Sequence, residues 1–173
     1  MILEKLLMPD FVFGSYKEVT PEFCRQHGIR ALLCDIDNTL VTYDDPEPTP
    51  ELLEWFGKMK DGGVSVAFVS NNHPERVERF NSSLGYPAYP DAKKPSPRFY
   101  AAAADALGVK REEAAVLGDQ LLTDAAAAHR FGVAALIVPP IKDKRSLFFR
   151  AKRLIERPYM KRAEKTARVR TQS

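Results

Sequence analysis

The chain has 173 residues, of which 45% are hydrophobic and 28% charged, and its net charge is +3, a composition typical of one globular domain. No segment approaches the roughly 20 apolar residues that span a bilayer, and residues 1–7 lack the long apolar stretch of a secretory signal, so we expect a cytoplasmic protein. The two cysteines, Cys24 and Cys34, have no CxxC spacing and disfavour a disulfide framework or a zinc site.

Strand and helix signals alternate along the chain. The apolar run 29–34 predicts a strand covered on both faces, and Thr49 and Pro50 are suited to cap and open a helix that ends at 61–63. The remaining predicted elements are a strand at 64–69, a helix from 74 to about 85, a short strand at 86–89, a helix at 97–107 capped by Ser96, a strand at 114–117, a helix at 123–131 and a strand at 134–138. This alternation predicts a doubly wound α/β fold, with a parallel sheet and helices on both faces.

Polar residues follow several of these strands. Residues 35–39, Asp-Ile-Asp-Asn-Thr, place two carboxylates two residues apart at the end of the first strand. Ligands of open α/β sheets collect beyond the carboxyl ends of the strands, and two anionic groups there need a cation or a shared proton. Later segments bring a hydroxyl, amides, lysines and further acids to the same edge: Ser70, Asn71 and Asn72; Lys93 and Lys94; Gly118, Asp119 and Asp124. The set favours a metal-assisted phosphoryl site.

These segments, in this order, resemble the four motifs of the haloacid dehalogenase-like (HAD) phosphohydrolases. The motifs correspond to residues 35–39, Ser70, Lys94 and 118–124, and the similarity spans about residues 30–140. The phrases CDIDNTLV, VSNN, KKPSPRF and GDQLLTD are especially similar to the YqeG-type subgroup, which is related to the phosphatidylglycerophosphate phosphatases of mitochondria and plastids. The stretch 124–132 departs from the Gly-Asn-Arg type of sequence expected of that subgroup, which leaves the roles of His129 and Arg130 open.

The resemblance implies a Mg²⁺-dependent phosphatase and a role for each motif residue. Asp35 is the implied nucleophile, which forms an aspartyl-phosphate, and Asp37 is the implied acid and base. The implied Mg²⁺ ligands are the carboxylates of Asp35 and Asp119 and the backbone carbonyl of Asp37. Lys94 would neutralise developing charge, and Asp124 would orient Lys94 or a metal-bound water. The implied phosphate-binding residues are Asn38, Thr39, Ser70 and Asn71.

Several of these assignments have a structural alternative. Ser70 and Asn71 could cap the helix that Pro74 opens. Lys93 competes with Lys94 for the role of the cation, and the resemblance favours Lys94 because it precedes a proline. Asp124 could be an acid favoured by the dipole at a helix N-terminus.

The site is expected to be open. Substrate-selecting caps of HAD enzymes are inserted between the first and second or the second and third motifs, and here the intervals 41–69 and 71–93 each hold only short elements. We therefore expect no large cap domain. An open site handicaps small substrates that must be enclosed and suits a phosphate carried on a larger molecule.

The C-terminal segment is strongly basic. From Lys144 to Ser173 there are eleven Lys or Arg and two Glu, a charge of +9, against −6 for the rest of the chain. Segment 146–158 interleaves basic and apolar residues in an amphipathic pattern able to lie on an anionic bilayer. A helix packed on the body, followed by a tail, is the alternative.

Two regions are therefore expected: a HAD-like phosphatase domain at 1–143 and a basic amphipathic helix and tail at 144–173. The leading hypothesis is a phosphatase for a lipid phosphomonoester, phosphatidylglycerol phosphate being the substrate that the resemblance implies, in the cytoplasm or peripherally at the inner face of the membrane. The second is a phosphatase for a soluble nucleotide, sugar or protein phosphate. The third is a phosphate-sensing or RNA-associated binding protein. Lys and Arg runs do bind RNA, but intact catalytic motifs count against this hypothesis and against nucleic acid as a partner.

Overall fold

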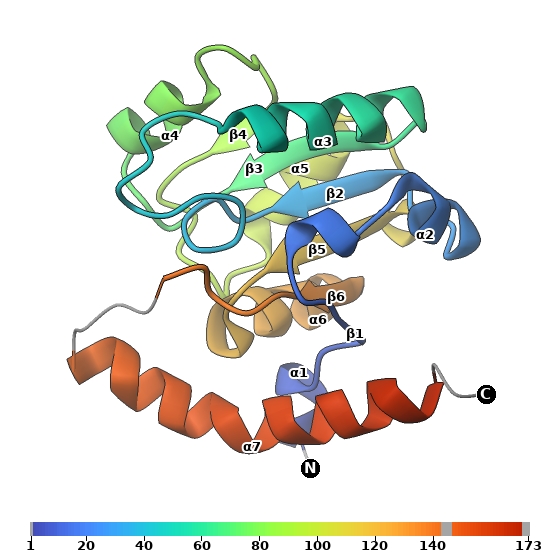
Figure 1. The fold of residues 1–173 in the computed structure, drawn as a ribbon, viewed down its shortest axis with the longest axis vertical. Coiled ribbons are helices and arrows are strands. Elements are labelled where there is room, and N and C mark those ends of the chain that lie inside the picture. The colour runs from blue at the N-terminus through green and yellow to red at the C-terminus, as the bar shows by residue number, and fades with distance from the viewer. Residues whose placement is uncertain (1, 143–146, 171–173) are drawn as a thin grey trace.

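The computed structural model describes residues 2–142 and 147–170. Within these ranges a six-stranded, parallel sheet with the order β1-β6-β5-β2-β3-β4 forms the centre of the molecule (Figure 1). Its strands are β1 (Phe11–Val12), β2 (Ala31–Cys34), β3 (Ser65–Val69), β4 (Ala88–Tyr89), β5 (Ala114–Gly118) and β6 (Ala134–Ile137). The predicted α/β fold with a parallel sheet is confirmed, and the described residues contain no large cap domain.

Helices cover both faces of the sheet. Their bounds are α1 (Ile2–Leu7), α2 (Pro21–Gln26), α3 (Pro50–Asp61), α4 (Pro74–Asn81), α5 (Arg98–Ala106), α6 (Ala126–Phe131) and α7 (Leu147–Arg170). Alternate residues of each strand point to opposite faces, so Leu32 and Cys34 pack with α2, α3 and α4, whereas Ala31 and Leu33 pack with α1, α5 and α6. Both faces of the central strand are buried, which explains its unbroken apolar sequence.

Helix α3 shows how local signals set an element. Thr49 Oγ1 accepts a hydrogen bond from the N–H of Leu52 at 3.3 Å, Pro50 occupies the first turn, and Gly62 ends the helix. The buried residues recur at helical spacing and pack on β2 and β3: Leu52, Trp55, Phe56 and Met59. Burial of such side chains stabilises the fold by roughly 1.5–3 kcal/mol each.

Three predicted helices differ in detail from the structure, and the first of them, α4, ends at Asn81 and not near residue 85. Helix α5 begins at Arg98 with Pro97 at the N-cap position, and Ser96, the predicted cap, lies one residue earlier, where its Oγ accepts from the Arg98 N–H at 3.5 Å. The segment predicted as a helix at 123–131 begins earlier, with a π-helical turn over Leu121–Ala125 that leads into α6. This wider turn brings Asp124 against Gly118, where a Cβ would lie 2.3 Å from the Asp124 Cγ. A glycine is therefore required at the end of β5.

The N-terminal elements were not predicted, and His129 holds them in place. His129 Nδ1 lies 2.8 Å from the Leu6 carbonyl oxygen, and Nε2 lies 2.9 Å from Asp10 Oδ2. Both partners accept hydrogen bonds, so both ring nitrogens donate and the imidazole is charged. The bond to Asp10 raises the pKa of His129 despite its partial burial. Asp10 Oδ2 also accepts from the Ala135 N–H at 2.8 Å, which ties β1 to β6.

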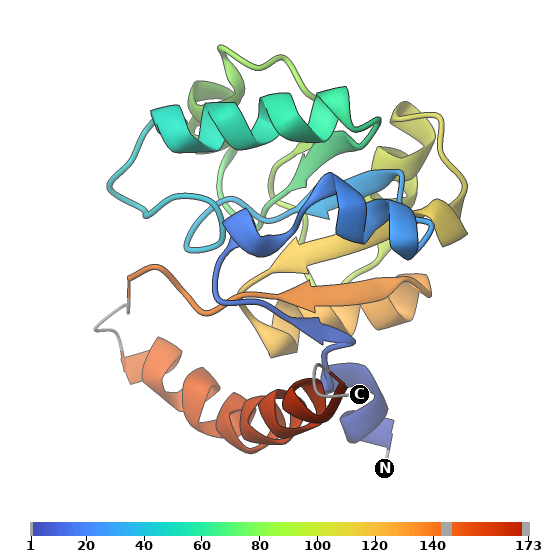
Figure 2. The same ribbon diagram turned by 45° about the vertical axis from the view of Figure 1, so that its right-hand side comes forward.

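Helix α7 lies across β1 and α1 (Figures 1 and 2). It buries Glu156 and Ala163, and Tyr159 and Met160 pack on the cluster shared with α1 and α6. None of the helices in the described ranges is both long and apolar enough to cross a membrane. The boundary predicted at 143/144 and the end of the tail at 171–173 lie outside the described residues.

Candidate active site

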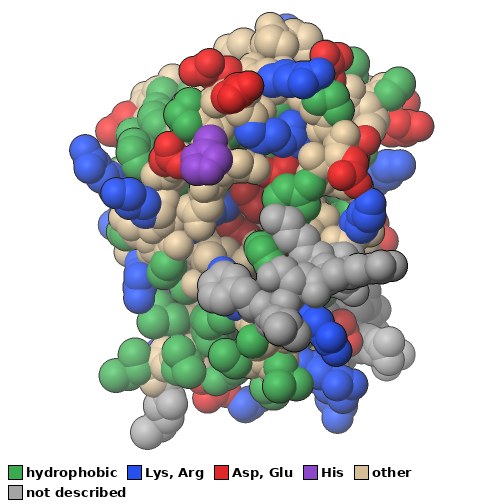
Figure 3. All heavy atoms as spheres, turned by 90° about the vertical axis from the view of Figure 1, so that its left-hand side faces the viewer, with side chains coloured by type: hydrophobic (Ala, Val, Ile, Leu, Met, Phe, Trp, Pro, Cys, Tyr) green, Lys and Arg blue, Asp and Glu red, His purple; other side chains and the backbone are tan. Residues whose placement is uncertain are grey.

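The carboxyl ends of β2, β3 and β5 bring the predicted site residues together. Asp35, Ser70 and Asp119 each follow one of these strands and are buried. Figure 3 faces this edge of the sheet and shows acidic side chains inside a hollow near its centre. The hollow has a volume of about 260 Å³, and its lining includes Asp35, Asp37, Ser70, Asn71, Asn72 and Lys94.

The structure separates the two lysines of the third motif. Lys94 is buried, and its Nζ lies 2.9 Å from Asp35 Oδ1 and 2.7 Å from Asp124 Oδ1, whereas Lys93 is exposed. Burial acts to lower the pKa of Lys94, but the charges of Asp124 and Asp35 outweigh it and raise that pKa well above its ordinary value. Lys94 is therefore the cation that faces the predicted nucleophile.

Asn71 positions the backbone of this lysine. Its Oδ1 accepts from the Lys94 N–H at 2.7 Å, and its Nδ2 donates to the Lys94 carbonyl at 3.4 Å. Arg130 reaches the same loop, because its Nη1 donates to the Pro95 carbonyl at 3.3 Å. Asn71 and Arg130 thus both support the loop that carries Lys94.

Three carboxylates form a cluster suited to a cation. Oxygen atoms of Asp35, Asp119 and Asp124 lie within 4.8 Å of one another, and all three residues are buried. Burial, together with the charge of Asp124, raises the pKa of both Asp35 and Asp119, although Lys94 opposes the shift. The cluster thus brings three buried acids together, and its carboxylate oxygens are the ligands that hard divalent cations prefer. These residues fit the metal ion that the fourth motif implies.

Asp124 also contacts groups outside this cluster. Its Oδ1 contacts Lys94, and its Oδ2 accepts from the N–H of Gln120 at 3.1 Å. Both carboxylate oxygens therefore have partners within the protein. This arrangement suits the predicted role of orienting Lys94.

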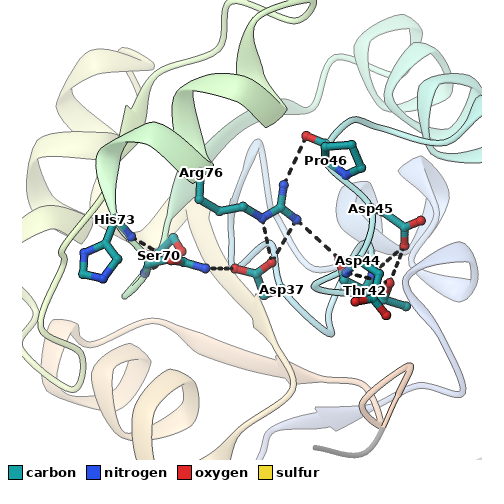
Figure 4. Close-up of polar contacts among 9 residues, drawn as sticks. Asp37, Thr42, Asp44, Asp45, Pro46, Ser70, His73 and Arg76 are labelled. Carbon is teal, nitrogen blue, oxygen red and sulfur yellow. Dashed lines mark hydrogen bonds and ion pairs between the residues drawn. The ribbon is translucent and has the colours of Figure 1, made fainter.

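Asp37 is bound from two sides (Figure 4). Its Oδ1 accepts from Arg76 Nη2 at 2.9 Å and Nε at 3.2 Å, and its Oδ2 accepts from Asn72 Nδ2 at 2.8 Å. Sequence reasoning assigned no function to Arg76. The one signal in the sequence for a role at the site was its place in the first turn of α4, shortly after the end of β3.

The residues predicted to bind phosphate have different surroundings. Ser70 is buried in the hollow, and its Oγ accepts from the Asn72 N–H at 3.1 Å. Thr39 Oγ1 donates to Asp119 Oδ1 at 3.3 Å. The Asn38 N–H donates to the Val41 carbonyl, and its side chain accepts from the Lys142 N–H. Phosphate binding by Asn38, Thr39, Ser70 and Asn71 stays a prediction.

Helix α7 forms a wall of the site that sequence reasoning missed. Arg153 Nη2 lies 3.2 Å from Asp119 Oδ2, and Phe149 and Lys152 line the hollow. Phe149 also lines a larger groove of about 850 Å³ between α7 and residues 138–140, which begins at Asp119 and Asn38. The basic amphipathic pattern of the segment could have indicated this contact.

Glu156 fixes α7 to the loop after β5. It is 3% exposed, and its Oε1 accepts from the N–H of Leu122 at 2.9 Å, within the π-helical turn. Burial raises the pKa of Glu156, although its bond to Leu122 and the charge of Arg153 oppose the shift. The helix is thereby joined to the segment that carries Asp119 and Asp124.

Comparisons with known proteins agree with this geometry. The family model of the haloacid dehalogenase-like hydrolases matches residues 13–132. The "Probable phosphatase YqeG" of Bacillus subtilis (strain 168) is 36% identical over 156 residues, which cover 90% of this chain and 91% of that protein. An uncharacterized protein from Listeria monocytogenes serotype 4b has a similar fold, with a TM-score of 0.54 and 20% identity over 68% of this chain and 85% of that one. A hypothetical protein from Xanthomonas campestris has a TM-score of 0.52 and 17% identity over 70% of this chain and 69% of that one. With its motif residues gathered at one edge of a parallel sheet, this chain belongs to the haloacid dehalogenase-like hydrolases.

Proposed function

We propose that this protein is a Mg²⁺-dependent phosphatase that hydrolyses the phosphomonoester of a lipid through an aspartyl-phosphate on Asp35. The observation that carries the phosphatase activity is the contact of 2.9 Å between Lys94 Nζ and Asp35 Oδ1 in a hollow at the carboxyl edge of the sheet. A buried ammonium beside a carboxylate holds the nucleophile in place and offers positive charge to an incoming phosphate.

The reaction has two steps. An oxygen of Asp35 attacks phosphorus, the bond from phosphorus to the leaving oxygen breaks, and that oxygen takes a proton from Asp37. Asp37 then takes a proton from a water whose oxygen attacks phosphorus, and the bond from phosphorus to Asp35 breaks. Lys94 and Ser70 bind phosphoryl oxygens in both steps. Mg²⁺, held by the carboxylates of Asp35 and Asp119 and the carbonyl of Asp37, would supply charge neutralisation when bound.

The groove beside α7 supports a lipid as the carrier of the phosphate. It begins at Asp119 and combines an apolar lining with three guanidinium groups: Val138, Pro139, Pro140, Phe149, Leu154 and Met160, with Arg150, Arg153 and Arg157. An amphiphile whose phosphate occupies the hollow could place its apolar part along this lining. Phosphatidylglycerol phosphate has this chemistry, and the related probable phosphatase makes a phosphatase the first activity to test.

Exposed apolar side chains of α7 support contact with an anionic membrane. Leu154 and Ile155 are 70% and 52% exposed, next to exposed basic residues of the same helix, and Ile2 and Leu3 on the adjacent α1 are 81% and 52% exposed. Figure 3 shows hydrophobic side chains gathered at the lower end of the molecule, with Lys and Arg nearby. Apolar anchors among basic groups are the pattern of interfacial helices.

A phosphatase panel tests the proposal. Release of inorganic phosphate is measured with Mg²⁺ from phosphatidylglycerol phosphate in anionic vesicles, and from glycerol phosphate, nucleotides and sugar phosphates in solution. We expect the lipid to be the preferred substrate, Asp35→Asn to abolish turnover, and Leu154→Ser to impair only the vesicle reaction. Leu53→Ser, which changes an exposed leucine of α3, is the matched control.

Each contrary outcome favours one of the other hypotheses. A preference for soluble phosphates, with Asp35→Asn inactive, would favour a soluble phosphatase and contradict the lipid assignment. Absence of phosphate release from every substrate, together with salt-sensitive RNA retention unchanged in Asp35→Asn, would favour a binding protein.

A further inference from the structure

Arg76 of α4 forms hydrogen bonds to Asp37 and to two backbone carbonyls beside the reaction centre. Its side chain is 16% exposed, and two of its nitrogens bind the same oxygen of Asp37, Nη2 at 2.9 Å and Nε at 3.2 Å (Figure 4). Asp37 itself is 6% exposed. This is a nearly buried ion pair on the residue proposed as acid and base.

Arg76 is itself held in place by the loop that follows the first motif. Its Nη1 donates to the Pro46 carbonyl at 3.1 Å and its Nη2 to the Thr42 carbonyl at 3.4 Å. Asp45 Oδ2 closes this loop by accepting from the Thr42 N–H at 2.9 Å and from Thr42 Oγ1 at 2.6 Å. A planar guanidinium can satisfy a carboxylate and two carbonyls together, whereas a lysine ammonium offers three donors at one point.

The two oxygens of Asp37 have different surroundings. Oδ1 is bound by Arg76, which is not part of the lining of the hollow, whereas Oδ2 is bound by Asn72, which lines it beside Asp35 and Ser70. Arg76 therefore anchors Asp37 from outside the hollow. The oxygen that remains on the inner side is Oδ2.

We propose that Arg76 is a positioning residue that orients Asp37 so that Oδ2 serves the leaving group in the first step and water in the second. The inference rests on the proposed roles of Asp35 and Asp37. In the first step the proton passes from Oδ2 to the leaving oxygen as the bond from phosphorus to that oxygen breaks. In the second step Oδ2 takes a proton from the attacking water. Loss of Arg76 thus matters only where proton transfer limits the reaction.

The test varies the leaving group. Wild type, Arg76→Met and Arg76→Lys are assayed with Mg²⁺ on phenyl, 4-nitrophenyl and 2,4-dinitrophenyl phosphate, whose leaving groups need progressively less protonation. Arg79→Met is the control, because Arg79 is exposed on the same helix. We expect Arg76→Met to lower kcat/KM for phenyl phosphate on the order of 100-fold, and for 2,4-dinitrophenyl phosphate by less than about threefold. Arg76→Lys should lie between Arg76→Met and the wild type.

A second signature separates positioning from a general loss of structure. With 2,4-dinitrophenyl phosphate the first step stays fast in Arg76→Met while the water step slows, so a burst of dinitrophenolate equal to the enzyme concentration should precede a lower steady rate. Circular dichroism melts check folding, and if Arg76→Met does not fold, Arg76→Lys provides the same comparison. Equal losses of kcat/KM across the series, without a burst, would overturn the inference while leaving the phosphatase assignment intact. A wild type inactive on all three esters and on every substrate of the phosphatase panel would overturn both.

Discussion

Glu156 links α7 to the loop that follows β5, and its replacement tests whether this helix is part of the folded domain. In Glu156→Ala the N–H of Leu122 loses its acceptor at 2.9 Å. In Glu156→Gln an amide oxygen can take the same place without the charge. The two variants therefore separate the hydrogen bond from the cost of burying a carboxylate.

The expected size of each effect follows from the environment. Loss of a hydrogen bond to a charged acceptor costs about 1.5–3 kcal/mol, which for a chain of this size lowers the Tm of Glu156→Ala by roughly 3–12 °C. Burial raises the pKa of Glu156 above its ordinary value of 4.5. The protonated form is thus favoured in the folded state, and the stability linked to it is lost as pH rises from 4.5 through the folded pKa. Glu156→Gln should gain stability relative to wild type over the same range.

Urea unfolding measured at several pH values checks both expectations. Glu164→Ala, which changes an exposed glutamate of the same helix, is the control and should stay within about 0.5 kcal/mol of wild type. If Glu156→Ala unfolds like Glu164→Ala, the contact with Leu122 contributes nothing and α7 is not fastened there. If the difference between Glu156→Gln and wild type is independent of pH, the effect assigned to burial is wrong.

Three further changes test other parts of the structure. Lys94→Met leaves Asp35 and Asp124 without their shared cation, so we expect a loss of about 3–5 kcal/mol in unfolding free energy. Its kcat should be lower than that of wild type by at least about 100-fold in the absence of an added amine that could replace the ammonium. His129→Gln should cost about 1–3 kcal/mol near pH 6; because the folded pKa of His129 is raised from 6.5, the difference should shrink as pH rises through that folded pKa, and a constant difference in urea unfolding would contradict the charged imidazole. Saturating Mg²⁺, at about 100 times its Kd, should stabilise the protein by about 2.7 kcal/mol, and Asp119→Asn should lose most of this shift in a thermal melt; an equal shift in both proteins would place the ion elsewhere.

The parts of the fold that were predictable have local causes. The cap Thr49 and the proline Pro50 directly begin α3 and Gly62 directly ends it, so its signals lie at its own ends and its bounds were predicted closely. Strand β1 has only two residues and pairs with β6 from the far end of the domain. So short a strand has no periodic pattern to detect. The π-helical turn before α6 likewise has no local signal, since its geometry depends on the contact between Asp124 and Gly118.

The same division applies to the site. Asp35 and Asp119 could be placed from the sequence because the carboxyl ends of neighbouring parallel strands meet at one edge. Lys94, the partner of Asp35, was also predicted, but the partners of Asp37 and Asp119 were not. Arg76 reaches Asp37 from α4, and Arg153 reaches Asp119 from α7. Such contacts depend on where each helix packs on the sheet. The spacing of residues within one helix does not predict that position.

Charge explains why these distant partners are needed. Ion pairs join four buried carboxylates to three cationic side chains: Asp35, Asp37, Asp119 and Asp124, with Lys94, Arg76 and Arg153. Each cation comes from a different segment of the chain. The cations therefore orient the carboxylates from different directions and also neutralise part of their charge. Among the described residues these ion-paired acids outnumber their cations, and burial, together with the charges of neighbouring carboxylates, raises the pKa of Asp35 and Asp119. A divalent cation would convert the excess into a net positive charge, which is the condition for attracting a phosphate dianion. The fold therefore supplies positive charge from three segments to keep the acids in place, and a bound metal ion would supply the remainder.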